Sequence, residues 1–147
     1  MKVFGTLRVP GDKSISHRAL IFGALSSGES RVTDILQSAD VHSTAGVLRS
    51  LGAEIPELSG DFVIRGRGRG LAQPTRDLDC GNSGTTTRLM AGVVSASPIE
   101  ATFVGDASLL VRCAQAWLAA GNTVTAVASR SDEVAAWAEA EGLQFER

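Results

Sequence analysis

The sequence predicts an α/β fold in which two rounds of alternating strands and helices follow one another. Short β-prone segments alternate with segments whose apolar residues recur at helical spacing, and turns rich in Gly, Ser or Asn separate them. The order strand, helix, strand, helix starts again near Arg76. The first round is expected over residues 1–66 and the second over residues 76–147, which together have the length of one domain.

The first round is predicted to form a βαβαββ unit. Its elements are expected at residues 2–9, 14–25, 29–35, 40–51, 53–58 and 61–65. Pro10-Gly11 ends the first strand, and the apolar residues of the first helix share one face. Asp40 is the expected N-cap of the second helix, and Gly52 follows that helix at its C′ position. The last two strands are expected to pair as a hairpin across Ser59-Gly60.

The second round is predicted to form a βαβαβ unit. Its elements are expected at residues 77–80, 85–94, 99–104, 108–120 and 123–128. A further helix is expected from Val134 to Glu141, because Ser131 is a good N-cap and acidic residues follow it. Residues 143–145 are expected to form a last short strand. The second round therefore continues into a helix where the first round ends in a hairpin.

Composition argues against several classes of function. The formal net charge is −2, so the chain has no overall positive field that would favour nucleic acid. Residues 66–70 alternate Gly and Arg, but this stretch is short and isolated, and we interpret it as a turn. No apolar run is long enough to span a membrane, and we expect no signal peptide.

The Cys and His residues predict no metal or redox cofactor. They are Cys80, Cys113, His17 and His42, and their spacing forms no metal-binding pattern. A reduced, cytoplasmic chain is the simplest expectation. His17 lies inside the first motif described next, and we expect it to have a structural or supporting role there.

The first candidate binding motif is Gly-Asp-Lys-Ser-Ile-Ser-His-Arg at residues 11–18, between a strand and a helix. Backbone N–H groups at a helix start are unpaired and attract anions. Lys13 adds a point charge, Ser14 can cap the helix or donate to a phosphate, and Arg18 follows Ser14 by one turn on the same face. A normal capped helix with solvated charges would explain these residues equally well.

The second motif is Gly-Asn-Ser-Gly-Thr-Thr-Thr-Arg at residues 81–88. Its glycines, including Gly84, would let the backbone approach a ligand closely, and Asn82 can bond a ligand or cap locally. Thr85 and Thr86 offer hydroxyls beside free N–H groups. The motif lacks the ending of a Walker A loop, and a plain helix cap stays open as the alternative.

A third strand-to-helix turn, Val-Gly-Asp-Ala-Ser at residues 104–108, is followed one turn later by Arg112. A surface arginine would also explain Arg112. The three turns together favour one site for a ligand with several negative groups, at the carboxyl ends of the strands. The pattern does not name a reaction.

Four segments, in matching order and spacing, resemble the 5-enolpyruvylshikimate-3-phosphate (EPSP) synthase family. They are residues 10–18, 38–41, 81–88 and 103–109, so the resemblance covers Met1 to about Arg112. The family belongs to the shikimate pathway and transfers the enolpyruvyl group of phosphoenolpyruvate to the 5-hydroxyl of shikimate-3-phosphate, without a metal or redox cofactor. The resemblance implies βαβαββ units whose helix N-termini face the ligand cleft.

Seven residues match substrate-binding positions of that family: Lys13, Ser14, Arg18, Asn82, Gly84, Thr85 and Arg112. By resemblance, the first three would hold shikimate-3-phosphate, and Lys13 would also face phosphoenolpyruvate. The next three would lie near the phosphoenolpyruvate phosphate, and Gly84 matches a position where added bulk hinders the herbicide glyphosate. Arg112 falls where the family has an arginine that clamps phosphoenolpyruvate.

The chain also departs from the family. The family enzyme has two domains, and its acid/base carboxylates lie in parts with no counterpart here, so we expect one truncated domain that is inactive alone. Apolar faces left exposed would allow self-association. From residue 102 the tail resembles the opening βαβα of a formyltransferase-type Rossmann domain, which makes the second unit atypical after about residue 112. This suggests a chimaera or recombined fragment, which a β-hairpin at residues 129–145 would contradict.

The main hypothesis is therefore an EPSP synthase-like portion that binds shikimate-3-phosphate and phosphoenolpyruvate. The alternative is a non-catalytic or chimaeric α/β module that retains the anion-binding motifs without using them. A fragment of a folate-using formyltransferase would explain only the tail. If Lys13, Arg18 and Arg112 lay on separate faces of the molecule, no inherited pocket would remain.

Overall fold

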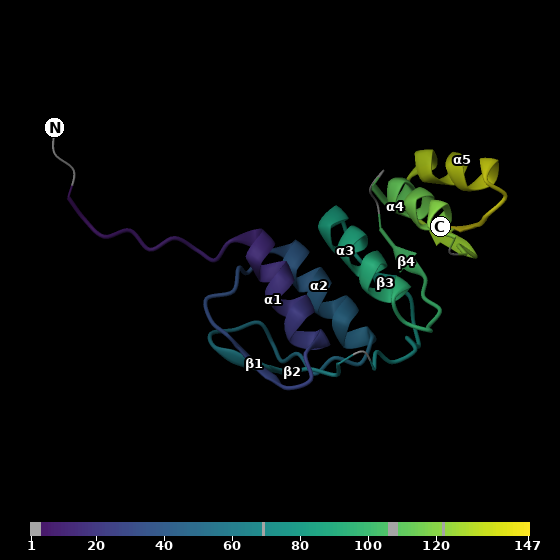
Figure 1. Cartoon of the computed structure of the whole chain (residues 1–147). Coiled ribbons are helices and arrows are strands. Elements are labelled where there is room, and N and C mark those ends of the chain that lie inside the picture. The colour runs from purple at the N-terminus through teal and green to yellow at the C-terminus, as the bar shows by residue number, and fades with distance from the viewer. Residues whose placement is uncertain (1–3, 69, 106–108, 122) are drawn as a thin grey trace.

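The computed structural model describes residues 4–68, 70–105, 109–121 and 123–147. The elements are α1 (Lys13–Leu25), β1 (Glu29–Val32), α2 (Ala39–Ser50), β2 (Phe62–Arg65), β3 (Leu78–Asp79), α3 (Gly84–Ser95), β4 (Phe103–Val104), α4 (Leu109–Ala119), β5 (Ala126–Ala128), α5 (Asp132–Ala140) and β6 (Gln144–Glu146). Figure 1 shows α1, α2 and α3 side by side, with α4 and α5 beyond α3. The first four helices pack in chain order, α1 on α2, α2 on α3 and α3 on α4.

Helix α1 begins one residue earlier than the sequence predicts, and a different side chain caps it. The Asp12 carboxylate accepts from the Ile15 N–H at 2.8 Å. The expectation that Ser14 caps the helix is therefore wrong, because Ser14 lies within the first turn and is exposed. The buried face of α1 includes His17 and Leu20.

Helix α2 begins with a different N-cap from the predicted one and ends at the predicted place. Ser38 is the N-cap and accepts from the Val41 N–H, so the prediction that Asp40 caps this helix is wrong. Asp40 lies in the first turn, where a negative charge suits the helix dipole. Gly52 follows the helix with φ 86°, and the Ala53 N–H donates to the Leu48 carbonyl at 2.9 Å, which closes a Schellman motif as predicted.

The predicted hairpin of residues 53–58 and 61–65 is wrong. Strand β2 pairs instead with β1 in an antiparallel sheet of two strands, and residues 53–58 contribute one isolated bridge, Glu54 to Arg65. The Arg49 side chain explains this, because it donates to the carbonyls of Ile55 and Pro56 and so takes acceptors that a strand pair would need.

The predicted first strand is also absent over its described part. Residues 4–9 form no strand, and Figure 1 shows them running out from the start of α1, while residues 2–3 lie outside the described residues. Phe4, Leu7 and Val9 are exposed. A strand needs a hydrogen-bonding partner, and no described segment pairs with this one. Residues 13–65 therefore form helix, strand, helix, strand rather than a βαβαββ unit.

The second half forms a parallel sheet in the order β3-β4-β5-β6. Parallel neighbours need crossovers, and α3, α4 and α5 supply them. This alternation was predicted from the sequence, although the strands are shorter than expected. Residues 129–145 form no hairpin, because α5 lies there and β6 runs parallel to β5.

Two apolar clusters hold these elements together. The larger one joins α1, α2, α3 and the β1–β2 sheet, with Leu20, Leu48, Ile64 and Met90 fully buried. The smaller one consists of Leu110, Val127, Val134 and Ala138. Phe103 on β4 packs against both clusters. Among the described residues no sheet runs through both halves, so helix packing joins them.

Gly66 provides a test of this packing. A Cβ atom there would lie 2.1 Å from the Ser26 carbonyl oxygen and 2.7 Å from that of Gly23. Since both are backbone atoms that cannot move away cheaply, Gly66→Ala is expected to lower the free energy of unfolding by about 2 kcal/mol or more. Chemical denaturation measures this change. Gly28→Ala is the matched control, because a Cβ at Gly28 meets open space, and equal losses in both variants would contradict the packing described.

Candidate functional site

The first turns of α1, α2 and α3 lie at one edge of the molecule. The Thr86 hydroxyl, in the first turn of α3, lies 3.2 Å from the carbonyl oxygen of Asp40 in the first turn of α2. Lys13, the first residue of α1, forms an ion pair with the Asp40 carboxylate. Figure 1 shows the three helices starting along the same edge. Their unpaired N–H groups and positive dipole ends therefore gather where an anion would be attracted.

The residues of the first motif lie on the solvent side of this edge. Lys13, Ser14 and Arg18 are exposed, and Arg18 follows Ser14 by one turn, as predicted. Arg18 forms no ion pair with another described residue, whereas Lys13 is held by Asp40. An anion at this edge would therefore compete with the Asp40 carboxylate for Lys13.

The second motif folds into a tight turn that leads into α3. Gly81 has φ 54°, and its N–H donates to the Asp79 carboxylate at 2.8 Å. Ser83 is the N-cap of α3 and accepts from the Thr86 N–H at 3.1 Å. Asn82 is therefore placed in an exposed position at the helix start.

Gly84 and Thr85, the other two predicted site residues of this motif, begin α3 and are half-buried. Gly105, directly after the neighbouring strand β4, lies close to the start of this motif. A Cβ at Gly105 would lie 3.3 Å from the Gly81 carbonyl oxygen. The carboxyl ends of β3 and β4 therefore adjoin, which is where parallel sheets commonly bind ligands.

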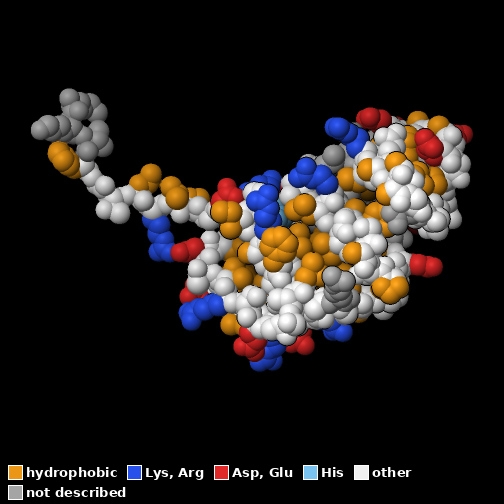
Figure 2. Space-filling view, viewed as in Figure 1, with side chains coloured by type: hydrophobic (Ala, Val, Ile, Leu, Met, Phe, Trp, Pro, Cys, Tyr) orange, Lys and Arg blue, Asp and Glu red, His pale blue; other side chains and the backbone are white. Residues whose placement is uncertain are grey.

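Arg112 lies apart from the first motif. It is exposed on α4, and residues 106–108 of its turn lie outside the described residues. Helices α2 and α3 separate α4 from α1. Figure 2 shows several Lys and Arg side chains along the edge over these helices.

Arg88 and Asp40 were not among the predicted site residues, although both lie near them. Burial raises the pKa of the Cys113 thiol, and the positive charges of Arg88 and Arg112 oppose this effect, so both arginines lie near Cys113. Arg88 follows Gly84 by four residues, the spacing that separates Arg18 from Ser14, and this repeated spacing could have revealed it. The ion pair of Asp40 with Lys13 depends on helix packing and has no local signal.

A chain of buried hydrogen bonds runs beneath the positive edge. His17 Nδ1 lies 2.7 Å from the Thr44 hydroxyl, which lies 2.7 Å from the Thr86 hydroxyl, which in turn lies 2.8 Å from the Ser83 hydroxyl. All four side chains are buried. Burial lowers the pKa of His17 below 6.5, the Asp40 charge raises it, and the Lys13 charge lowers it further. The imidazole is therefore neutral at neutral pH.

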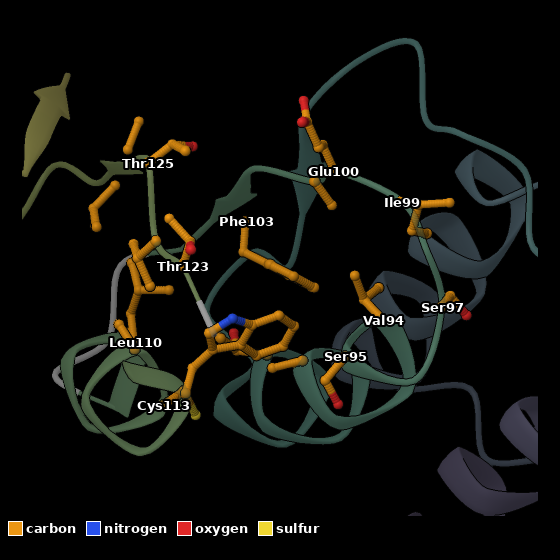
Figure 3. A pocket seen from close by; sticks show the side chains of 18 residues that line it. Val94, Ser95, Ser97, Ile99, Glu100, Phe103, Leu110, Cys113, Thr123 and Thr125 are labelled. Atoms are coloured by element: carbon orange, nitrogen blue, oxygen red, sulfur yellow. The ribbon is translucent and has the colours of Figure 1, made fainter. Parts of the chain in front are cut away.

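The cavity in Figure 3 lies between α3 and α4. It has a volume of about 460 Å³ and extends to the β4–β5 strands, with Val94, Ile99, Phe103 and Leu110 among its walls. None of the seven predicted site residues lines it. Because its walls offer little countercharge for phosphates, we place the candidate site at the helix starts.

Other classes of site find no support in the described residues. No three His, Cys, Asp or Glu side chains gather there as a metal site would require. No described helix is long and apolar enough to cross a membrane. In the Gly-Arg stretch, Arg67 is not a free cation, because it donates to the carbonyls of Gly52 and Gly70.

Comparison with known proteins points to one family. The family model described as EPSP synthase (3-phosphoshikimate 1-carboxyvinyltransferase) matches residues 1–138, which extends past Arg112, where the sequence resemblance was expected to end. The 3-phosphoshikimate 1-carboxyvinyltransferase of Bradyrhizobium sp. (strain BTAi1) is 58% identical over 111 residues, which cover 74% of this chain and 25% of that protein. That of Mesorhizobium japonicum is 52% identical over 106 residues, which cover 71% of this chain and 24% of that protein.

Solved structures agree with these relatives. An EPSP synthase from Acinetobacter baumannii superimposes with a TM-score of 0.75 at 37% sequence identity, and the match covers 84% of this chain and 29% of that one. The chain thus spans about a quarter of the length of the curated relatives it matches.

The pKa of His17 gives a prediction for stability against pH. Because the folded-state pKa is lower than the ordinary 6.5, the unfolded chain binds the proton more tightly, and stability falls as pH decreases through about 6.5. His17→Gln is expected to flatten this part of the curve of unfolding free energy against pH. His42→Gln, which removes an exposed imidazole, serves as the control, and an identical slope in wild type and His17→Gln would contradict the assignment.

Proposed function

Because this chain belongs to the EPSP synthase family, we propose that it forms the part of an enolpyruvyl transferase that binds shikimate-3-phosphate and phosphoenolpyruvate. The observation that supports this most is the common edge formed by the starts of α1, α2 and α3, which carries both motifs. The relatives named 3-phosphoshikimate 1-carboxyvinyltransferase match the N-terminal part of the chain, which contains both motifs.

We assign the shikimate-3-phosphate side to α1. Lys13, Ser14 and Arg18 are exposed there and offer an ammonium, a hydroxyl and a guanidinium within about one turn of helix. A dianionic phosphate would take Lys13 from Asp40, because it carries more charge than the carboxylate. Lys13 would then contact both substrates, since its ammonium reaches Asp40 at the start of α2, which adjoins the start of α3.

We assign phosphoenolpyruvate binding to the turn before α3. Asn82, Gly84 and Thr85 would approach its phosphate, and Arg112 would reach its carboxylate from α4. Two substrates with phosphates and carboxylates repel one another, and fixed positive groups reduce this cost and orient the hydroxyl for attack.

A non-catalytic or chimaeric α/β module is the second candidate. Two observations favour it: the curated relatives match only about three quarters of the chain, and β6 extends the sheet beyond residue 138, where the family match ends. In such a module the Lys13–Asp40 ion pair would be structural, and no phosphate would displace it.

Isothermal titration calorimetry with shikimate-3-phosphate separates the two candidates. If α1 binds the phosphate, Lys13→Ala should weaken binding about tenfold to a hundredfold, because a charge-assisted contact is lost. Arg31→Ala is the matched control, since Arg31 is an exposed cation paired with Asp61 on the β1–β2 side. Equal heats for wild type and Lys13→Ala would favour the inert module.

A turnover assay tests the extent of catalysis. The chain of 147 residues is expected to release no phosphate above background from shikimate-3-phosphate and phosphoenolpyruvate, because the acid/base carboxylates of the family have no counterpart in it. Product formation at rates typical of enzymes would overturn this expectation.

A further inference from the structure

The buried contacts beneath the positive edge join three helices through one threonine. The Thr86 hydroxyl has three oxygen neighbours: Thr44 Oγ1 at 2.7 Å, Ser83 Oγ at 2.8 Å and the Asp40 carbonyl at 3.2 Å. These belong to α2, to the N-cap of α3 and to the first turn of α2. Thr44 continues the chain to His17 on α1.

From this arrangement we propose that His17, Thr44 and Thr86 act as a positioning relay, which sets the spacing between the turns before α1 and α3 so that both contact one ligand. The inference rests on the proposed function of that edge. The relay ends on Ser83 and Asp40, the residues that cap α3 and hold Lys13.

The direction of the relay follows from its acceptors. The Thr86 hydroxyl has one proton, and both the Asp40 carbonyl and the Ser83 hydroxyl can accept it, so Thr86 accepts from Thr44. Thr44 then accepts from His17, whose proton lies on Nδ1. This leaves His17 Nε2 unprotonated, which agrees with its burial without a partner among the described residues.

The relay fixes the spacing between helices more narrowly than apolar packing does. The core already holds the three helices through fully buried Leu20, Leu48 and Met90, and apolar contacts tolerate small slides between helices. Hydrogen bonds of 2.7 Å fix the separation of their atoms and weaken steeply when misaligned. Replacing two bonded hydroxyls by methyl groups of similar shape changes stability little, so spacing and stability can be separated.

The test compares Thr86→Val with Thr86→Ser and Thr87→Val by calorimetry with shikimate-3-phosphate. Thr87 is the matched control, because it is also buried, is adjacent, and hydrogen-bonds the Ser83 carbonyl within its own helix. Thr86→Val is expected to bind about three- to tenfold more weakly, while the other two bind as the wild type does. The double variant Thr44→Val/Thr86→Val should lose the same binding affinity for shikimate-3-phosphate. Its thermal unfolding midpoint should lie near that of Thr87→Val. If Thr86→Val binds as tightly as Thr87→Val, the relay is refuted.

A second measurement does not depend on binding. In two-dimensional ¹H–¹⁵N NMR spectra of the free chain, Thr44→Val is expected to shift amide signals in both turns, residues 11–14 and 82–85, although Thr44 lies in neither. Shifts confined to α2 would overturn the inference. If the wild type fails to bind shikimate-3-phosphate while both turns shift, the proposed function fails and the relay stands.

Discussion

The structure depends on bringing the starts of three helices to one edge and keeping them there. Helix N-termini repel one another because each carries partial positive charge, and Lys13 and Arg18 add full charges. The packed faces of α1, α2 and α3 provide the general attraction. The Asp40 carboxylate offsets part of the repulsion, since it lies in the first turn of α2 and pairs with Lys13.

The pattern of elements could be predicted because it is local. Helices α2, α3 and α4 begin and end close to the expected residues, and Gly52 ends α2 as its position in the sequence indicated. The predictions of the two N-cap residues were wrong for the same reason. Asp12 and Ser14, like Ser38 and Asp40, are capping residue types two positions apart, and only the backbone angles decide which of them lies outside the helix.

The strands were harder to predict because they depend on partners. Residues 4–9 have a strand-like sequence but no strand partner among the described residues, and the carbonyls of Ile55 and Pro56 accept from Arg49. The candidate site shows the same difference between local and long-range features. Both motifs were visible because they are contiguous, whereas the contacts of Asp40 and Thr86 cross between helices. Arg112 was expected in a common pocket with Lys13 and Arg18, and the packing order places its helix, α4, next to α3 and away from α1.

The small cluster behind α4 has a consequence for how this edge would come apart. Among the described residues, four buried side chains hold α4, β5 and α5, against twenty in the larger cluster, so we expect the C-terminal half to open locally while α1 to α3 stay folded. Arg112 belongs to that less protected half. Mild denaturation would therefore displace Arg112 first, because its helix unfolds first. Lys13 and Arg18 would keep their places on the folded helix α1.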